Sequence, residues 1–145
     1  MTTDDQILRD ILSREGGYVE DLVDRGRCTN FGITRSTLQD WRGKLTTCAD
    51  VRNLQEDEAC EIYRARYIRP FDGVDDSIRP QVIDIAVNSG VSRARALLAL
   101  AQQGPKPLNT QLVIERLKHY ARLVQADSSQ ARFIGGWINR AVSFL

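Results

Sequence analysis

Apolar side chains recur at helical spacing along most of this chain, and the pattern is lost only in the segment 18–34. Residues three and four positions apart share one face of a helix, so the pattern predicts amphipathic helices. Within 18–34, Asp, Gly, Thr and Asn accumulate instead, which indicates a loop with short strands, one of them near 30–33. We therefore expect an α+β fold that is mainly α, with a small β element near the N-terminus.

The predicted helices begin with one that Thr3 and Gln6 cap and that Gly16 and Gly17 end. The segment 80–89 is apolar on nearly every side, which favours a central helix buried in a helical bundle. Gly-Pro-Lys-Pro at 104–107 is interpreted as a loop within one domain, and Asn109 or Thr110 is expected to cap the helix after it. The remaining predicted helices cover 36–42, 54–68, 92–103, 109–125 and 129–142.

Length and charge limit the class of protein. The 145 residues fit a single domain, in which we expect a catalytic half at 1–78 and a helical half at 79–145. A net charge of +1 gives no reason to expect a nucleic acid partner. No apolar run reaches the roughly 18–20 residues that span a bilayer, and the acidic first residues do not resemble a signal peptide. We expect a monomer made in the cytoplasm, without stable membrane insertion.

The cysteines and the single histidine indicate no metal or redox chemistry. Cys28, Cys48 and Cys60 match neither a zinc pattern nor a CxxC pair, so we expect reduced thiols in a protein folded in the cytosol. His119 alone cannot supply a catalytic triad or a zinc site. The sequence thus predicts neither a metal nor a cofactor.

Two carboxylates suit the cleavage of glycosidic bonds. Such reactions use one carboxyl group as a proton donor and a second at the opposite face of the sugar. Glu15 stands at a helix C-terminus, where the helix dipole and partial burial favour the neutral acid. Asp24 follows nine positions later in a polar segment that favours the ionised form, and Thr29 or Asn30 can hold a water beside it. The alternatives are an Asx turn for Asp24 and a surface position for Glu15.

Five segments, in order along nearly the whole chain, resemble the signature of glycoside hydrolase family 108, the N-acetylmuramidases of phage endolysins and bacterial wall-release enzymes. They are EGGY at 15–18, TNFGIT at 29–34, EIYRARYIRP at 61–70, DIAVNSG at 84–90 and FIGGWINR at 133–140. The resemblance implies a lysozyme-like fold that hydrolyses the β-1,4 bond between N-acetylmuramic acid and N-acetylglucosamine. It makes the glycan strands of peptidoglycan the expected partner.

The resemblance also implies roles for individual residues. The catalytic glutamate of the family falls on Glu15, and Asp24 matches the aspartate of its D-x-G-G stretch. The positions expected to shape the substrate cleft are Tyr18, Thr29, Asn30 and Thr34, while Asn88 either reaches the sugar or crosses helices in the core.

Two departures from the family pattern bear on these expectations. The second glycine of D-x-G-G is replaced by Arg27, and Cys28 stands where a small residue is expected, so the Asp24 turn can differ. The segment 102–109 is shorter than the peptidoglycan-binding repeat of the family, which predicts narrower wall recognition. Trp41 and Trp137 are expected in the core rather than against sugar rings.

Two other functions stay open from the sequence. A lytic transglycosylase uses one glutamate as acid and base and does not need Asp24. A wall-binding module that lost activity would keep the fold, although Glu15 is intact. If the substrate lies beyond the inner membrane, in the periplasm or at the cell wall, a holin or a secretion system is the expected partner for export.

Overall fold

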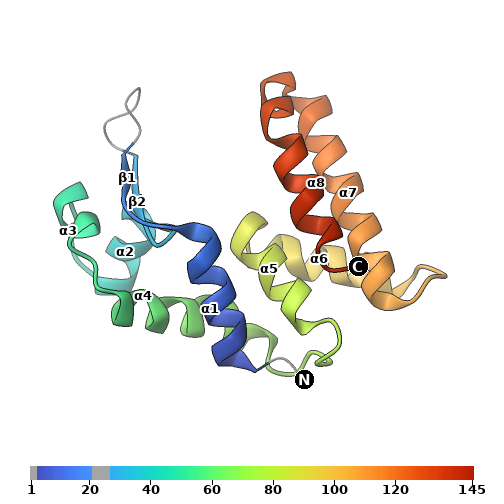
Figure 1. The fold of residues 1–145 in the computed structure, drawn as a ribbon, viewed down its shortest axis with the longest axis horizontal. Helices are drawn as coiled ribbons and strands as arrows, with labels where there is room; N and C mark the ends of the chain where they lie inside the picture. The colour runs from blue at the N-terminus through green and yellow to red at the C-terminus, as the bar shows by residue number, and fades with distance from the viewer. Residues whose placement is uncertain (1–2, 21–26) are drawn as a thin grey trace. The chain divides into compact units, whose positions relative to one another are not determined.

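The computed structural model describes residues 3–20 and 27–145. The chain divides into two compact units, Thr2–Pro70 and Phe71–Leu145. Helices dominate both units, and a small antiparallel sheet follows the first helix along the chain (Figure 1). The predicted fold class, α+β and mainly α, is confirmed.

The first unit starts with α1 (Asp4–Glu15). As predicted, Thr3 caps this helix: its hydroxyl oxygen accepts a hydrogen bond from the backbone N–H of Gln6 at 3.2 Å. The helix ends because Gly16 turns to a φ of 72°, a conformation that glycine adopts without a Cβ penalty. Glu15 is therefore the last helical residue, as the sequence indicated.

The sheet has the order β1 (Val19–Glu20), β2 (Cys28–Asn30) and β3 (Ile33–Thr34), with both pairings antiparallel. Thr29 lies opposite Val19 on one side and Thr34 on the other. The predicted strand at 30–33 is wrong in its centre, because Phe31 and Gly32 form the turn between β2 and β3 with φ values of 53° and 76°. Two consecutive left-handed residues are what a tight hairpin turn requires.

A short helix that the sequence did not predict, α3 (Cys48–Arg52), follows α2 (Arg35–Arg42). Thr47 and Asp50 form a complete capping box at its start. With five residues the helix is too short to show an apolar period. Its first residue, Cys48, is bonded to Cys28, with 5.8 Å between the Cα atoms. The expectation of three reduced thiols is therefore wrong, since the fold brings two cysteines together that lie 20 positions apart.

The helix predicted at 54–68 begins later and changes its geometry before it ends. The regular part is α4 (Glu56–Tyr63), which continues as a π-helical turn, η1 (Arg64–Ile68), and a 3₁₀ turn, η2 (Arg69–Phe71). Arg42 of α2 holds α4 in place through a two-pronged bond to Glu58, at 2.7 and 3.0 Å.

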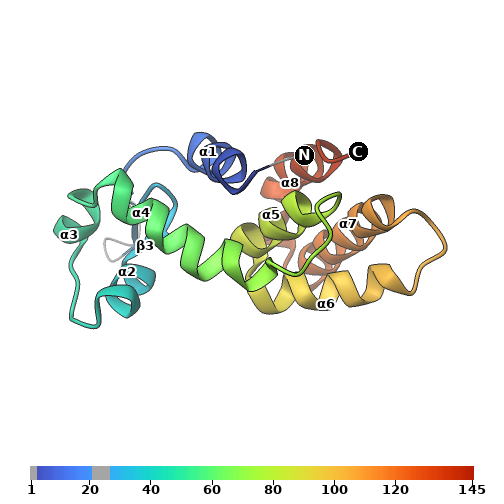
Figure 2. The same ribbon diagram turned by 90° about the horizontal axis from the view of Figure 1, so that it is seen from below.

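The second unit is helical throughout its described elements. They are α5 (Arg79–Ser89), α6 (Val91–Gln102), α7 (Leu108–Ala126), η3 (Ser128–Phe133) and α8 (Ile134–Val142). Each packs on the next, α5 on α6, α6 on α7 and α7 on α8 (Figures 1 and 2). The predicted apolar helix is α5, buried from Gln81 through Ala86, and the predicted last helix starts as the 3₁₀ turn η3.

Asn109 and Trp137 both make contacts inside the second unit. The predicted cap by Asn109 or Thr110 is wrong: α7 starts after Pro107, and the Asn109 amide donates to the Phe144 carbonyl at 2.6 Å. Trp137 packs into the cluster around Val113, Tyr120 and Ala141, with its ring 5.1 Å from that of Tyr120. In the described ranges, no helix is long and apolar enough to cross a membrane.

Candidate active site

The predicted acid, Glu15, is held against the β2–β3 turn. A Cβ atom built on Gly32 would lie 2.8 Å from Oε2 of Glu15 and 2.9 Å from its Cβ. The left-handed φ of Gly32 also favours glycine. The turn therefore contacts Glu15 through the backbone of Gly32. Because Gly32 has no side chain, this contact holds Glu15 and leaves its carboxyl half-buried.

Tyr63 of α4 supports the same turn. Its hydroxyl donates to the carbonyl oxygen of Phe31 at 2.5 Å, and the built Cβ of Gly32 would lie 2.6 Å from the hydroxyl oxygen. Because Tyr63 is 2% exposed, this bond is protected from water. Tyr63 thus positions the turn that positions Glu15.

Tyr67 lies in the π-helical turn one turn after Tyr63, and the two rings are 5.6 Å apart. Burial raises the pKa of the Tyr67 phenol, the Arg66 charge lowers it, and the nearby Glu15 carboxylate raises it again. The net shift is upward, so Tyr67 keeps its proton in neutral solution and is available as a hydrogen-bond donor near Glu15. π-helical turns are frequent at functional sites, which makes Tyr67 a candidate residue of the site.

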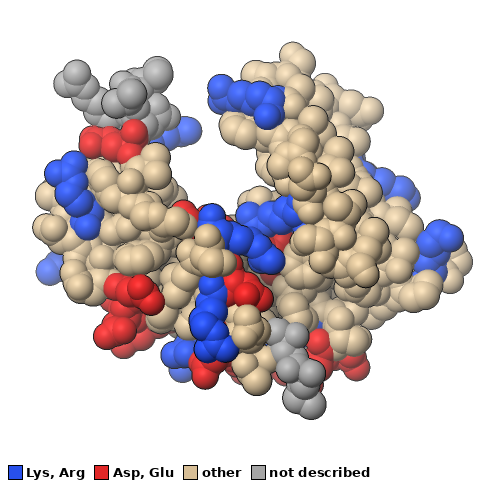
Figure 3. All heavy atoms as spheres, in the orientation of Figure 1, with Lys and Arg blue, Asp and Glu red and all other residues tan. Residues whose placement is uncertain are grey.

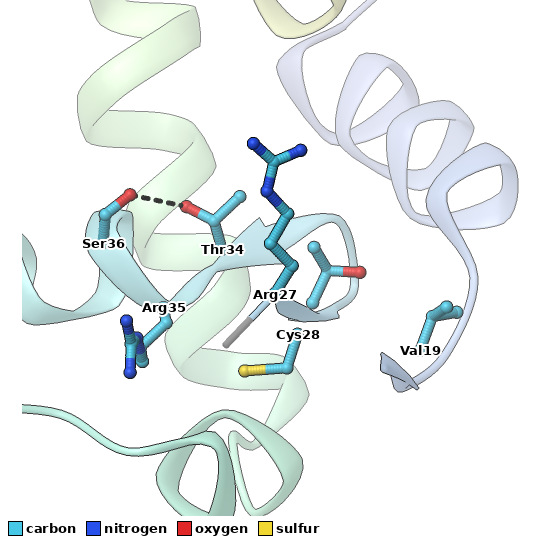
Figure 4. A pocket seen from close by; sticks show the side chains of 7 residues that line it. Val19, Arg27, Cys28, Thr34, Arg35 and Ser36 are labelled. Carbon is cyan, nitrogen blue, oxygen red and sulfur yellow. Dashed lines mark hydrogen bonds between the residues drawn. The ribbon is translucent and has the colours of Figure 1, made fainter. Parts of the chain in front are cut away.

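A pocket of about 620 Å³ opens beside the sheet (Figure 4). The side chains of Arg27 and Arg35 point away from each other, and the hydroxyls of Thr34 and Ser36 are joined at 3.1 Å. Hydroxyls and guanidinium groups together suit a ligand with sugar hydroxyls and carboxylates. The described lining residues are Val19, Arg27, Cys28, Thr29, Thr34, Arg35 and Ser36.

The structure brings two predicted cleft residues together and gives two others supporting contacts. Thr29 and Thr34 are register partners in the sheet and line the same pocket, while Thr34 also caps α2 through the N–H of Thr37. Asn30 is buried, and its amide donates at 3.1 Å to the carbonyls of Val51 and Arg52 at the end of α3.

Tyr18 lies under the Arg52 guanidinium, at 4.8 Å from the ring centre, with its hydroxyl near Glu20. The described lining of the pocket includes neither Tyr18 nor Glu15. Both residues nevertheless flank the same sheet, Glu15 at the β2–β3 turn and Tyr18 just before β1.

The two remaining predicted site residues are Asp24 and Asn88. Asp24 lies outside the described residues. Asn88 belongs to the second unit, where its Oδ1 accepts hydrogen bonds from the hydroxyls of Tyr120 at 2.9 Å and Ser89 at 3.2 Å. On the face drawn in Figure 3, Lys, Arg, Asp and Glu mix with a larger uncharged area, as the small net charge of +1 would suggest.

Sequence reasoning missed two residues that hold Glu15 in place and one that stabilises the sheet. Gly32 and Tyr63 belonged to the matched segments TNFGIT and EIYRARYIRP and had no assigned role. The disulfide of Cys28, which ties β2 to α3, had no local signal at all. An aromatic residue followed by glycine between two short strands is the signal that could have identified the turn.

Comparisons with known proteins agree on the class of this chain. The solved structure described as "Structure of Brucella abortus SagA" is similar, with a TM-score of 0.73 and 26% sequence identity over 97% of this chain and 94% of that chain. None of the curated proteins matches the chain. Its fold is lysozyme-like, mainly α with a small sheet.

Family models match almost the full length. The model described as "Glycosyl hydrolase 108" matches residues 8–90, and the one described as "Predicted Peptidoglycan domain" matches residues 83–142. The chain belongs to the glycosyl hydrolase 108 family. The two matches support a glycoside hydrolase that acts on peptidoglycan, and they confirm the resemblance seen in the sequence.

Proposed function

We propose that this protein is an N-acetylmuramidase that hydrolyses the β-1,4 bond between N-acetylmuramic acid and N-acetylglucosamine in peptidoglycan. The observation that carries the proposal is the carboxyl of Glu15, the last residue of α1, held at the β2–β3 turn by Gly32 and Tyr63. The pocket beside that hairpin, with its hydroxyls and arginines, suits a glycan that carries peptide carboxylates.

In this mechanism Glu15 donates a proton to the glycosidic oxygen as the bond to the sugar carbon breaks. Asp24 orients the attacking water as a base, or stabilises positive charge at that carbon. Tyr63 and Tyr67 act on Glu15 rather than on the sugar, the first through the turn and the second as a protonated neighbour. The reaction needs no further group from solution except water.

The decisive experiment digests purified peptidoglycan, reduces the products with borohydride and identifies them by mass spectrometry. A muramidase yields new muramitol ends. Glucosaminitol ends would identify a glucosaminidase and anhydro-muramyl ends a lytic transglycosylase, and either result overturns the proposal. Binding to sacculi with no soluble fragments at all would identify an inactive wall-binding module.

Variants of the two carboxylates then assign the roles. Glu15→Gln should lower the rate by about 10²–10⁴-fold, the usual contribution of a general acid, with the melting temperature nearly unchanged. Substantial residual lysis by this variant would remove Glu15 from the mechanism. Asp24→Ala should also be strongly impaired, whereas a near-normal rate would favour the transglycosylase.

We further propose that the protein works as a monomer in the periplasm or at the cell wall, in lysis or local wall remodelling, and that a holin or a secretion system carries it there. Cell fractionation with and without such an export partner tests the location. Sedimentation or gel filtration of the purified chain tests the monomer, and a stable dimer would contradict it.

A further inference from the structure

Two sequence motifs of the second unit meet at one buried carboxylate. Asp84 of α5 is 2% exposed and accepts hydrogen bonds from two arginines. Arg116 of α7 donates at 2.8 Å, and Arg140 of α8 donates through Nε at 2.9 Å. Asp84 belongs to the segment DIAVNSG and Arg140 to FIGGWINR, so this cluster explains why both segments carry a charged residue in a buried region.

The cluster continues from Arg116 to Asn88. Arg116 also donates to the hydroxyl oxygen of Tyr120 at 3.0 Å, and a guanidinium can only donate. The single proton of the Tyr120 hydroxyl is thus left for Asn88, 2.9 Å away. Because Tyr120 is 2% exposed, a reversed Asn88 amide would leave this proton buried without an acceptor. Oδ1 of Asn88 must therefore point toward Tyr120.

This orientation directs the other end of the amide to solvent. Asn88 is half-buried, and its Nδ2 makes no hydrogen bond within the described part of the chain. Nδ2 is also not among the buried unpaired side-chain atoms of that part, so water reaches it. Asn88 consequently presents two N–H donors in a fixed direction near the end of α5.

The cluster is poorly suited to stability alone. Arg116 is fully buried, yet its Nε and Nη1 have no hydrogen-bond partner in the described part of the chain. Buried ion pairs with unpaired donors are often less stabilising than apolar residues of the same size. Their presence is better accounted for by the direction that they impose on Tyr120 and Asn88.

We propose that Nδ2 of Asn88 is a preoriented donor for a carbonyl oxygen of the wall polymer, from an N-acetyl group or a stem peptide, and that Asp84, Arg116 and Tyr120 position it. The proposal rests on the proposed function, because it takes peptidoglycan as the ligand. Asn88 lies within the region that matches the peptidoglycan domain, residues 83–142. A donor that is already fixed loses little rotational freedom when it binds, which favours affinity.

The test measures binding to purified sacculi by co-sedimentation, in a Glu15→Gln background so that the ligand is not consumed. Asn88→Asp keeps an acceptor for Tyr120 and replaces the donor by a second acceptor, so binding should weaken about tenfold. The loss should persist at about 1 M salt, where the Debye length is about 3 Å and the new charge is screened. Tyr120→Phe removes the hydrogen bond that orients the Asn88 amide, so binding should weaken about three- to fivefold. Unchanged binding of Asn88→Asp would overturn the proposal.

NMR of the Asn88 side-chain amide separates positioning from a general loss of structure. In the Glu15→Gln protein these signals should shift when ligand is added, and in Tyr120→Phe the shift should be reduced even where the fold is intact. N-acetylglucosamine oligomers and free stem peptides, added separately, distinguish the two carbonyl sources. No shift with either probe or with muropeptides contradicts the proposal. A different outcome would refute only the muramidase activity: Asn88→Asp binds sacculi about tenfold more weakly, but the protein that keeps Glu15 releases no muramitol ends.

Discussion

The two units of this protein hold their polar groups in opposite ways. The first unit keeps the Glu15 carboxyl half-buried, with the backbone of the Gly32 turn packed against the Glu15 side chain. The second unit buries a carboxylate, Asp84, completely and surrounds it with two arginines. The two ion pairs fix Asp84 and its neighbours in one arrangement, whereas the Gly32 turn leaves the Glu15 carboxyl half-buried.

This contrast teaches where substitutions will act. In the first unit, small changes at the hairpin should affect the reaction more than the fold. In the second unit, changes at the charged cluster should affect the fold first. Hydrogen exchange, read separately for residues 27–70 and 71–145, can locate each loss of protection.

The largest expected effect is on stability, from Asp84→Asn. The change leaves two arginines near a neutral amide in a buried place, and breaking a buried pair typically costs about 3–5 kcal/mol. Asp40→Asn is the matched control, because Asp40 pairs with Arg66 at 3.0 Å on the surface, where such a pair is worth about 0–1 kcal/mol. Urea unfolding should rank the two variants in this order. Equal costs would remove the distinction between the units.

Loss of the disulfide should come next. Cys28→Ser should lower the free energy of unfolding by about 3 kcal/mol, since the bond closes a loop of 20 residues in the unfolded chain. Cys60→Ser is the control, because Cys60 forms no disulfide. Adding a reductant should destabilise the parent protein but leave Cys28→Ser unaffected. If the reductant has no effect on the parent, the bond does not form in solution.

A smaller stability effect, with a clear effect on rate, is expected for Gly32→Ala. Both Gly32 and Gly43 have left-handed φ values, of 76° and 69°, so the backbone conformation alone should make alanine cost about 1–2 kcal/mol at either position. Only at Gly32 would the new methyl group meet the Glu15 and Tyr63 side chains, while at Gly43 there is nothing within 4 Å. Wall hydrolysis should therefore fall about tenfold or more in Gly32→Ala and remain normal in Gly43→Ala. Equal rates would show that the turn does not position Glu15.

The smallest effect is a pH dependence that comes from His119. Burial, with the charges of Arg93 and Arg122, lowers the pKa of His119 in the folded state from 6.5. The stability contributed by the neutral ring is therefore complete above pH 6.5 and is lost as the pH falls below that value toward the folded pKa. The free energy of unfolding of His119→Gln should therefore change less between about pH 7.5 and about pH 5 than that of the parent protein. If the free energies of unfolding of the variant and the parent depend on pH in the same way, His119 is not the source of the pH dependence.

The sequence predicted the elements whose signal is local and repeated. The cap at Thr3, the end of α1 at Gly16 and the apolar helix α5 all follow from residues within a few positions of each other. The helix α3 was not predicted, because five residues carry no period, and the π-helical turn η1 was not, because its residues are ordinary helix formers. The disulfide lay beyond any local signal.

For the candidate site, the sequence by itself determined the family and predicted which residues carry the chemistry. Glu15 at a helix end and the ordered motifs are properties of the chain alone. Only the tertiary structure decided how these residues are held. The approach of Gly32 to Glu15, the bond of Tyr63 to the turn and the path from Asp84 to Asn88 join residues far apart in the chain. The largest separation is 56 positions, between Asp84 and Arg140. Such contacts depend on packing in space, which no local spacing encodes.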